Sequence, residues 1–300
     1  MTFKFGIIGN GFVGKATQLL TSKTHTVKIY DVDPDKCYPP NIKLADLNDC
    51  HIIFVAVPTP SNPDGSCHLE LVTSVVKNVR ALNIRAHIVI RSTVVVGTCD
   101  ELDCYFMPEF LTEKNWANDV YQCRNWIVGM KNMDSDRDRD NIDFMEKMTA
   151  LISDARDEGA IQFNNLTFVS NKEAEMIKYY RNTFLAIKVS YSNEIHEFCK
   201  KNSIDYETVR RVATQDERIG SSHTVVPGPD GHFGFGGTCF PKDMHSLLYQ
   251  FETAGIPSYI IRSAVHRNNE RDRHERDWMD DIGRAFITRV AQPAKNESPE

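Results

Sequence analysis

No run of apolar residues in this chain of 300 residues approaches the roughly 18 that a transmembrane helix requires, so no membrane contact is predicted. An excess of positive charge is also missing, because 35 lysines and arginines stand against 41 aspartates and glutamates, a net charge of −6. This balance argues against nucleic acid as a partner but leaves room for a small anionic ligand held by local cations. Repeats and low-complexity tracts are lacking apart from a short polar tail at 291–300. No secretory signal is expected, because a predicted strand follows Met1 directly.

The eight cysteines show neither the density of a disulfide scaffold nor the spacing of a zinc site. No CxxC pair occurs, and the closest pair, Cys99 and Cys104, has no neighbouring histidine at ligand spacing. We therefore expect a reducing, cytoplasmic location, no metal, and thiols that are mostly buried and unreactive. The hydrophobic fraction of 41% and the charged fraction of 25% are ordinary for a globular protein. The length suggests about two domains.

A glycine pattern follows the first predicted strand. The apolar run 3–8 reads as a strand, and Gly9-Asn10-Gly11-Phe12-Val13-Gly14 comes at once, followed by a predicted helix at 15–20 and a strand at 26–30 that ends at Asp31. This order is the context in which GxGxxG marks a dinucleotide-binding site. Gly9 is expected to make the turn, Gly11 to admit the pyrophosphate and Gly14 to let helix and strand pack closely, with the phosphates at the helix N-terminus. Asp31 would bind the ribose hydroxyls and repel a 2′-phosphate, which favours NAD over NADP.

Strands and helices alternate along the first 170 residues. Further strands are predicted at 52–57, 87–90, 105–107, 126–128 and 167–169, with helices at 68–82 and 136–152. This alternation predicts an α/β fold with a Rossmann-type, doubly wound parallel sheet. Ligands bind such sheets at the carboxyl ends of the strands, where Gly9, Thr59, Thr93 and Glu109 fall.

Beyond residue 170 the pattern becomes helical. Ser170 and Glu173 have the spacing of a capping box, and the helix predicted from there to Lys201 contains no proline or glycine. Further helices are predicted at 205–214, 242–254 and 258–290. The run 267–276 is dense in charges of both signs, which favours a solvated helix face. The predicted domains are 1–170, an NAD-binding Rossmann domain; 171–290, an all-helical central domain with the cysteine loop described next; and 291–300, a polar tail.

One cysteine stands between a glycine-rich loop, 233–237, and a predicted helix start. Pro241 suits the first helical turn, and Asp243 complements the positive end of the helix dipole. Cys239 would lie beside that dipole and near Lys242, two influences that favour the thiolate. The glycines let the backbone approach a ligand closely. The alternative is a structural cysteine before an ordinary helix cap.

The long predicted helix carries polar residues on one face. Lys178, Asn182, Leu185, Val189 and Asn193 are spaced four, three, four and four residues apart, so they share that face. The alternative is that Lys178 extends to water and that Asn182 makes only a local hydrogen bond.

Together these motifs resemble the UDP-glucose/GDP-mannose dehydrogenase family, whose members oxidise a sugar-nucleotide alcohol to a carboxylate with two NAD. The resemblance covers nearly the whole chain, and its segments are 9–14 with Asp31, 57–60, 91–94 with 97–98, 108–113, 173–182, 193–194, 216–220 and 233–243. It implies NAD as the cofactor, a nucleotide-sugar substrate with UDP-glucose as the first choice, and a homodimer packed through the helical domain.

The resemblance also implies how the reaction proceeds. A first hydride transfer would give an aldehyde, to which Cys239 adds to form a thiohemiacetal, and a second would give a thioester. Lys178 and Asn182 would stabilise the negative oxygen.

The remaining roles come from the same resemblance. Asp243 and Thr93 would orient a water and assist proton transfer, and Glu113 would activate the water that hydrolyses the thioester. The implied cofactor contacts are Gly9, Asn10, Gly11, Phe12, Val13, Gly14, Asp31, Lys36, Thr59, Thr93 and Lys242. The implied substrate contacts are Glu109, Phe110, Leu111, Glu113, Lys178, Asn182, Gly228, Pro229, Asp230, Gly231, His232 and Gly236, with Arg218 reaching the site of the other subunit.

One departure from the family is large. Longer members carry a C-terminal Rossmann-like domain that contributes to the nucleotide site, whereas this sequence stops at Glu300. Either a short form or a second chain that supplies the missing half is expected. The alternatives are the same reaction on GDP-mannose or a UDP-amino sugar, a truncated NAD-binding partner protein without turnover, and a two-electron hydroxyacid dehydrogenase. The last of these has no need of the Cys239 loop.

Overall fold

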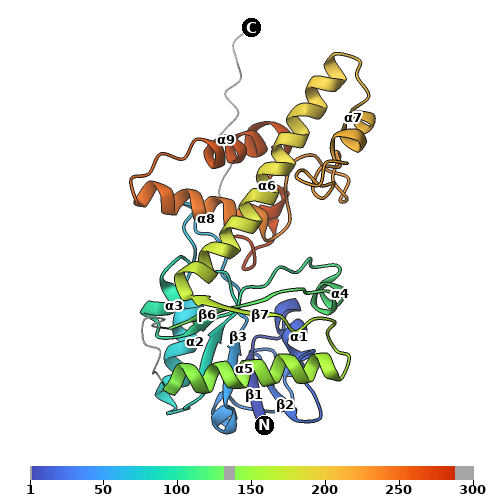
Figure 1. Cartoon of the computed structure of the whole chain (residues 1–300). Coiled ribbons are helices and arrows are strands. Elements are labelled where there is room, and N and C mark those ends of the chain that lie inside the picture. The colour runs from blue at the N-terminus through green and yellow to red at the C-terminus, as the bar shows by residue number, and fades with distance from the viewer. Residues whose placement is uncertain (1, 132–138, 288–300) are drawn as a thin grey trace. The chain divides into compact units, whose positions relative to one another are not determined.

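The computed structural model describes residues 2–131 and 139–287. The chain folds into two compact units, one formed by Met1–Thr59 and Leu69–Lys178 and the other by Pro60–His68 and Tyr179–Glu300. The division falls inside the long helix α6 (Asn171–Lys201), labelled in Figure 1. The predicted tail at 291–300 lies outside the described residues, as do 136–138 and 288–290 of two predicted helices.

The first unit is built on a seven-stranded sheet in the order β2-β1-β3-β4-β5-β6-β7 (Figure 1). The strands are β1 (Phe3–Ile8), β2 (His25–Tyr30), β3 (Ile52–Val55), β4 (His87–Ile90), β5 (Tyr105–Phe106), β6 (Trp126–Met130) and β7 (Leu166–Ser170). Neighbouring strands are parallel except β5 and β6, which pair antiparallel through Phe106 and Gly129. The doubly wound Rossmann-type sheet is confirmed, with this one antiparallel pair as a correction.

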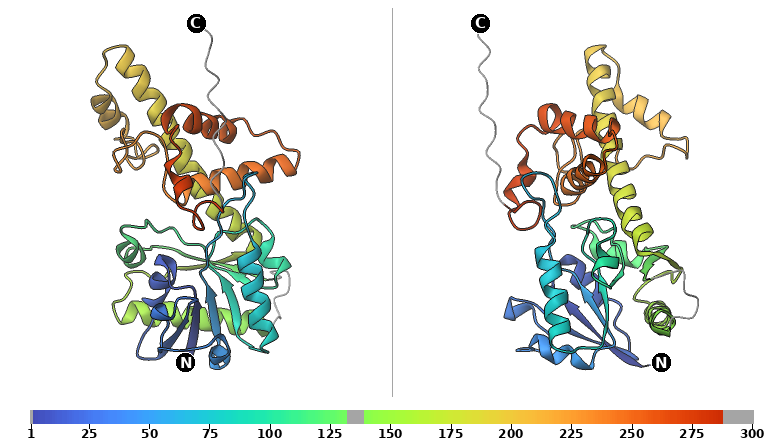
Figure 2. Two further views of the ribbon diagram at one scale, coloured as in Figure 1. Left: turned by 180° about the vertical axis from the view of Figure 1, so that it is seen from behind. Right: turned by 90° about the vertical axis from the view of Figure 1, so that its left-hand side faces the viewer.

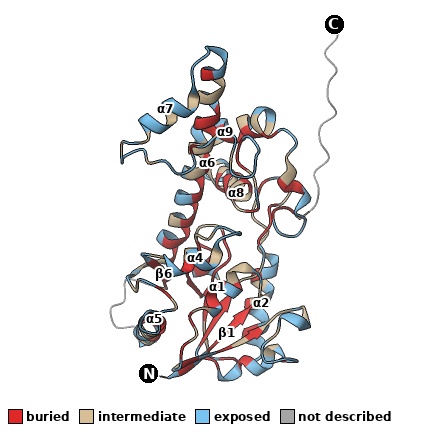
Figure 3. Cartoon of the chain, turned by 90° about the vertical axis from the view of Figure 1, so that its right-hand side faces the viewer, coloured by how far each residue is buried: buried red, intermediate tan, exposed pale blue. Residues whose placement is uncertain are grey.

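Helices cover both faces of this sheet, as the rear and side views in Figure 2 show. One face packs against α1 (Phe12–Gln18), α4 (Trp116–Tyr121) and α5 (Arg139–Asp157), and the other against α2 (Glu70–Ala81), α3 (Thr98–Glu101) and the start of α6. Strand β3 is buried along its whole length, which explains its unbroken apolar sequence. Figure 3 shows much of the sheet around the labelled β1 in the red of buried residues. Two 3₁₀ turns, Pro34–Lys36 and Leu44–Asp49, complete the described elements of this unit.

Helix α6 begins at the predicted capping box. The Ser170 hydroxyl accepts from the Glu173 backbone N–H at 3.3 Å, and the Glu173 carboxylate accepts from the Ser170 N–H at 2.8 Å. The predicted start and length of this helix are confirmed. Among residues 2–131 and 139–287, no helix has the length and apolar character needed to cross a membrane.

The second unit contains the rest of α6 together with α7 (Tyr206–Ala213), α8 (Phe240–Thr253) and α9 (Ile260–Arg267). Its core includes Phe235, Met244 and Val265. The segment Pro60–His68 joins this unit although it lies early in the sequence. The Ser61 N–H donates to Ala285 O at 2.8 Å, and the Ser61 carbonyl accepts from Ile287 N at 3.0 Å. The sequence contained no pattern that indicated this pairing.

The prediction of one helix over 258–290 is wrong. Helix α9 ends at Arg267 and continues as a π-helical turn, Asn268–Asp272, which is followed by a separate 3₁₀ turn, Asp277–Asp280. The solvated face predicted for 267–276 is wrong in part, because Asn268 and Arg273 are buried at 0% and 3% exposure. Their polar groups bond to a neighbouring loop, which a continuous α-helix would not allow.

The turn after β1 depends on two close backbone approaches. Gly9 has a φ of +93°, and a Cβ there would lie 2.6 Å from Ala56 O. A Cβ on Gly14 would lie 2.1 Å from Gly9 O, whereas one on Gly11 would meet nothing within 4 Å. Gly9 and Gly14 are therefore required by packing, and Gly11 faces open space.

Gly14→Ala is expected to destabilise the first unit by about 1–3 kcal/mol, a typical cost of overpacking. In a helix without this contact the same change stabilises by about 0.5–1 kcal/mol. Gly11→Ala is the matched control, with an expected cost below about 1 kcal/mol for an alanine N-cap. Urea unfolding followed by circular dichroism measures both variants. A Gly14→Ala protein as stable as the wild type would contradict the close packing of α1 on the turn.

Candidate active site

The glycine turn is tied to the carboxylate at the end of β2. The Asn10 N–H donates to Asp31 Oδ2 at 2.6 Å, and the Asp33 N–H donates to Asp31 Oδ1 at 2.9 Å. The Asn10 side chain donates to Lys36 O at 2.8 Å. The structure thus brings together Asn10, Asp31 and the Lys36 backbone, while the Lys36 amino group pairs with Asp33 at 3.0 Å.

The same turn has the features that a dinucleotide requires. The position beside Gly11 is open, and no side chain caps the first turn of α1, which carries Phe12 and Val13. The buried Oδ1 of Asn10 has no hydrogen-bond partner. This turn lies at the carboxyl edge between β1 and β3, where the order of strands reverses direction, which is the place where open α/β sheets bind ligands. These residues fit a dinucleotide with its pyrophosphate near Gly11 and its ribose near Asp31.

A buried ion pair lies in the first unit, between the segment after β5 and helix α6. Lys178 Nζ donates to the Glu109 carbonyl at 2.5 Å and to Glu109 Oε1 at 2.8 Å. Both residues are buried, at 2% and 6% exposure. Glu109 Oε2 accepts from the Leu111 N–H at 2.8 Å, and the ammonium lies 5.5 Å from the centre of the Phe110 ring. The alternative that Lys178 extends to water is therefore wrong.

Thr93 lies on a loop fixed by neighbours that the sequence analysis did not single out. The Ser92 hydroxyl donates to Val57 O at 2.6 Å. Further along, the buried Glu175 of α6 accepts from the N–H groups of Gly97 and Cys99 at 2.5 and 2.8 Å. Burial raises the pKa of Glu175, and the two N–H groups oppose that shift.

Arg91 is a second buried cation in this part of the first unit. It is 4% exposed, its Nη1 lies 3.2 Å from Met107 Sδ, and its Nε has no partner. Burial lowers the pKa of Arg91 to about 10, against the opposite effect of Glu109. Thr59 and Thr93 are buried, whereas Glu113 lies on an exposed turn before α4.

Cys239 lies at the N-cap of α8, so the predicted helix start is confirmed. Pro241 and Asp243 both fall in the first turn. Cys239 is only partly buried, and the Thr238 hydroxyl lies 3.8 Å from its sulfur. By contrast, burial raises the pKa of both Cys50 and Cys104 to about 12, which keeps those thiols protonated.

Asp243 is held from both sides within the second unit. The Asn182 amide donates to its Oδ2 at 2.5 Å, and Lys242 Nζ donates to its Oδ1 at 2.5 Å. Asp243 is fully buried. Burial alone would lower the pKa of Lys242, but Asp243 together with Cys239 and Cys67 raises it above its usual range. The alternative of a merely local hydrogen bond for Asn182 is therefore wrong.

The loop before Cys239 is held by hydrogen bonds within its own backbone and by an ion pair with Arg273. The Gly228 N–H donates to His232 O at 2.8 Å, and the Gly231 N–H donates back to Gly228 O at 2.9 Å. Asp230 pairs with the buried Arg273 at 2.7 Å. Pro229 and His232 are exposed, and Gly236 is partly buried. The glycines of this segment were a signal that another group approaches the backbone closely, but spacing alone could not identify Arg273.

Arg218 stands apart from these groups. Its side chain is exposed and forms a two-point ion pair with Asp216, with contacts at 2.9 and 2.5 Å. All of its described hydrogen bonds go to Asp216, so within this chain none of them joins it to another predicted site residue.

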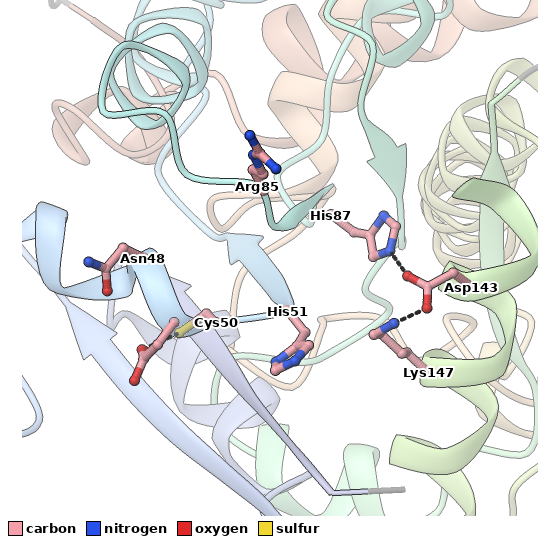
Figure 4. Close-up of a pocket in the computed structure, with 8 residues that line it drawn as sticks. Asn48, Cys50, His51, Arg85, His87, Asp143 and Lys147 are labelled. Atoms are coloured by element: carbon pink, nitrogen blue, oxygen red, sulfur yellow. Dashed lines mark hydrogen bonds and ion pairs between the residues drawn. The ribbon is translucent and has the colours of Figure 1, made fainter. Parts of the chain in front are cut away.

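A hollow of about 300 Å³ lies at the opposite, amino-terminal edge of the sheet (Figure 4). His87 Nε2 donates to Asp143 Oδ2 at 2.6 Å, and Lys147 pairs with the same carboxylate. The hollow is lined by Asn48, Asp49, Cys50, His51, Arg85, His87, Asp143 and Lys147. These residues are all outside the predicted site. The negative charge of Asp143 is balanced by Lys147 and by the hydrogen bond from His87.

Two family models match the chain. Residues 41–148 match the NAD binding domain of the UDP-glucose/GDP-mannose dehydrogenase family, and residues 172–270 match its central domain. Curated relatives include the UDP-glucose 6-dehydrogenase of Pseudomonas aeruginosa, 31% identical over 240 residues, which are 74% of this chain and 49% of the relative. That of Rickettsia bellii is 30% identical over 238 residues, 75% of this chain and 51% of the relative. The chain thus spans about half the length of these relatives.

Solved structures show the same architecture. A UDP-glucose dehydrogenase from Pyrobaculum islandicum superposes with a TM-score of 0.73 at 25% identity, over 90% of this chain and 68% of that one. The Mycobacterium tuberculosis 3-hydroxyisobutyrate dehydrogenase has a TM-score of 0.64 at 15% identity, over 90% and 94% of the two chains, and at that identity it shows the fold alone. With the family's NAD binding and central domains both matched and with curated relatives along three quarters of its length, the chain belongs to the UDP-glucose/GDP-mannose dehydrogenase family.

Proposed function

We propose that this chain is an NAD-dependent nucleotide-sugar dehydrogenase that oxidises the C6 alcohol of UDP-glucose to the carboxylate of UDP-glucuronate. The observation that carries the proposal is Cys239 at the start of α8, one turn before an Asp243 carboxylate held by Asn182 and Lys242. A two-electron hydroxyacid dehydrogenase has no use for a thiol at this place. NAD, when bound, supplies the hydride acceptor for each oxidation.

Cys239 would make the four-electron reaction possible by retaining the aldehyde. The first oxidation removes a hydride and a proton from the alcohol. The Cys239 thiolate then forms a C–S bond to the aldehyde carbon, and the carbonyl oxygen becomes an alkoxide that takes up a proton. Loss of the second hydride and of that proton gives a thioester. Water attacks the thioester carbon, the C–S bond breaks, and the thiolate leaves.

Lys178 and Asn182 would stabilise the negative oxygen in these steps. An ammonium has three donors, and Glu109 takes two of those of Lys178, which leaves one for the substrate. Asn182 likewise gives one N–H to Asp243 and keeps a second. Donors that are fixed in advance and shielded from water stabilise developing charge without reorganisation.

The proton transfers are assigned to the remaining predicted residues. Asp243, fixed through both oxygens, and the buried Thr93 would orient a water beside the sugar. Glu113 would accept a proton from the water that attacks the thioester, a task that suits a carboxylate in contact with solvent.

The choice of UDP-glucose rests on the names of the curated relatives near 30% identity. Solved structures of the same fold include a GDP-mannose dehydrogenase and a UDP-N-acetyl-mannosamine dehydrogenase. GDP-mannose and UDP-amino sugars therefore remain the alternative substrates within this proposal. The cofactor is NAD, because a 2′-phosphate near the Asp31 carboxylate would be repelled. We also keep the domain boundary near residue 170, with all the predicted cofactor contacts except Lys242 before it and the cysteine loop after it.

The proposal includes a homodimer formed through the helical unit. Its support is a row of exposed aromatic side chains along α6, Tyr180, Phe184, Tyr191 and Phe198. Exposed apolar surface of this extent is typical of an interface. Sedimentation equilibrium is expected to give twice the monomer mass at micromolar protein, and a monomer mass alone would contradict this part.

The reaction is tested by counting NADH per acid formed with a panel of UDP- and GDP-sugars. Two NADH per sugar acid are expected, because an alcohol must lose four electrons to become a carboxylate. A ratio of one would indicate a two-electron dehydrogenase. If no sugar gave NADH, a binding protein without turnover would be favoured. The sugar that is oxidised fastest in the panel identifies the substrate.

Cys239→Ser is expected to lower acid formation about a thousandfold or more, in the range found when a nucleophile is removed. A serine hydroxyl is far less ionised than a thiol, and the alkoxide released when its ester is hydrolysed is a poorer leaving group than a thiolate. Cys123→Ser, which removes another partly buried thiol, is the control and should keep normal turnover. Undiminished acid production by Cys239→Ser would rule out covalent catalysis by this residue.

A further inference from the structure

Two buried side chains that follow α9 hold the loop Gly228–Gly237, Asn268 through the Phe235 backbone and Arg273 through the Asp230 carboxylate. We propose that Asn268 and Arg273, here called the loop clamp, are positioning residues that fix this loop in the shape that binds the nucleotide sugar. The inference rests on the proposed function, because Asp230 and Gly236 of this loop are among the predicted substrate contacts. Neither clamp residue belongs to the predicted site.

Asn268 pairs with the loop backbone as a neighbouring strand would. Its Oδ1 accepts from the Phe235 N–H at 2.7 Å, and its Nδ2 donates to the Phe235 carbonyl at 3.0 Å. A Cβ on Gly234 would lie 2.3 Å from Asn268 Oδ1, and the φ of Gly234 is +69°. Asn193 of α6 accepts from the Gly234 N–H at 3.2 Å. The amide therefore fits only against a glycine in this conformation.

Arg273 bonds to one end of the loop, packs against the other, and is itself oriented by Asp277. Its Nη1 donates to Asp230 Oδ2 at 2.7 Å, and its Nε and Nη2 form a fork with the Asp277 carboxylate at 2.6 Å each. A Cβ on Gly236 would lie 2.2 Å from the guanidinium carbon, so this plane lies directly against the loop backbone. Such two-point pairing gives orientation as well as energy.

The π-helical turn makes the clamp possible. The Arg273 N–H donates to Asn268 O at 2.9 Å, a bond between residues five apart. In an α-helix two residues five apart point about 140° away from each other, so they could not both reach one loop. The wider turn brings them to the same side. Interruptions of this kind are frequent at functional sites.

The burial of the clamp separates positioning from direct catalysis. Asn268 and Arg273 are 0% and 3% exposed, and their polar groups are used within the protein. They act through the loop. The start of α8, which carries Cys239, has anchors of its own in the hydrogen bonds of Asn182 and Lys242 to Asp243, although Phe235 of the loop and Met244 of α8 share one apolar core. Loosening the clamp should therefore weaken sugar-nucleotide binding more than it slows the chemical steps.

Arg273→Lys keeps the charge but loses the fork, and it is expected to raise KM for the nucleotide sugar roughly tenfold or more, since small misplacements of a positioning group cost up to about a hundredfold. KM for NAD should stay within about twofold, and kcat should fall much less than KM rises. Asp277→Asn keeps Arg273 and weakens only the ion pair that orients it, so KM for the nucleotide sugar should rise in this variant too. This second variant tests the clamp even if Arg273→Lys fails to fold.

Arg271→Lys is the matched control. Arg271 lies on the same turn, but it is exposed and pairs with Glu197, so its kinetics should match the wild type. A merely structural role would reduce the active fraction and thus kcat, with both KM values unchanged. That result for Arg273→Lys and Asp277→Asn would overturn the proposal.

Hydrogen–deuterium exchange of peptides covering 228–238 tests the clamp without turnover. Exchange should rise in Arg273→Lys and Asp277→Asn, stay at the wild-type level in Arg271→Lys, and stay unchanged across α8 in all three. Equal exchange in every variant would overturn the clamp itself. A wild-type protein that forms no NADH with any sugar would instead overturn the proposed function, whichever way the exchange result falls.

Discussion

Hydrogen bonds from buried polar side chains of α6 are the constraint on which the predicted site residues of each unit depend. In the first unit, Glu175 holds the loop after β4, and Lys178 holds Glu109. In the second unit, Asn182 holds Asp243, and Asn193 reaches Gly234. A buried polar group is costly unless it is hydrogen-bonded, so breaking any of these contacts would cost free energy, and each partner is thereby held in place.

The two units differ in what organises their predicted site residues. In the first, backbone geometry dominates: glycine positions let the turn and α1 pack within van der Waals distance, and Asp31 is oriented by two backbone N–H groups. In the second, charge dominates, because the carboxylate of Asp243 lies between an amide and an ammonium next to a partly exposed thiol. Cofactor binding is thus a matter of shape and the proposed covalent step a matter of local charge.

Much of this arrangement could be read from residue patterns. The strands, the capping box of α6 and the start of α8 depend on neighbours close in the sequence, and all were predicted within a few residues. The continuous helix over 258–290 was wrong, because Asn268 and Arg273 bond to a loop more than thirty residues earlier. The pairing of Ser61 with Ala285 was missed for the same reason. Arg91 and Glu175 were not singled out, since their burial becomes visible only in three dimensions.

The sequence by itself determined the Rossmann-type first unit, the family, and the residue types available for catalysis, because periodic patterns and glycine spacing are local properties of the chain. Only the tertiary structure decided the fate of individual charges. It placed Lys178 on Glu109 instead of in water, put Asp243 between two donors, and turned Arg273 from a presumed surface residue into the anchor of a loop. The reason is physical: the free energy of a charged group depends on its burial and on the partners that folding brings to it, and these come from distant parts of the chain.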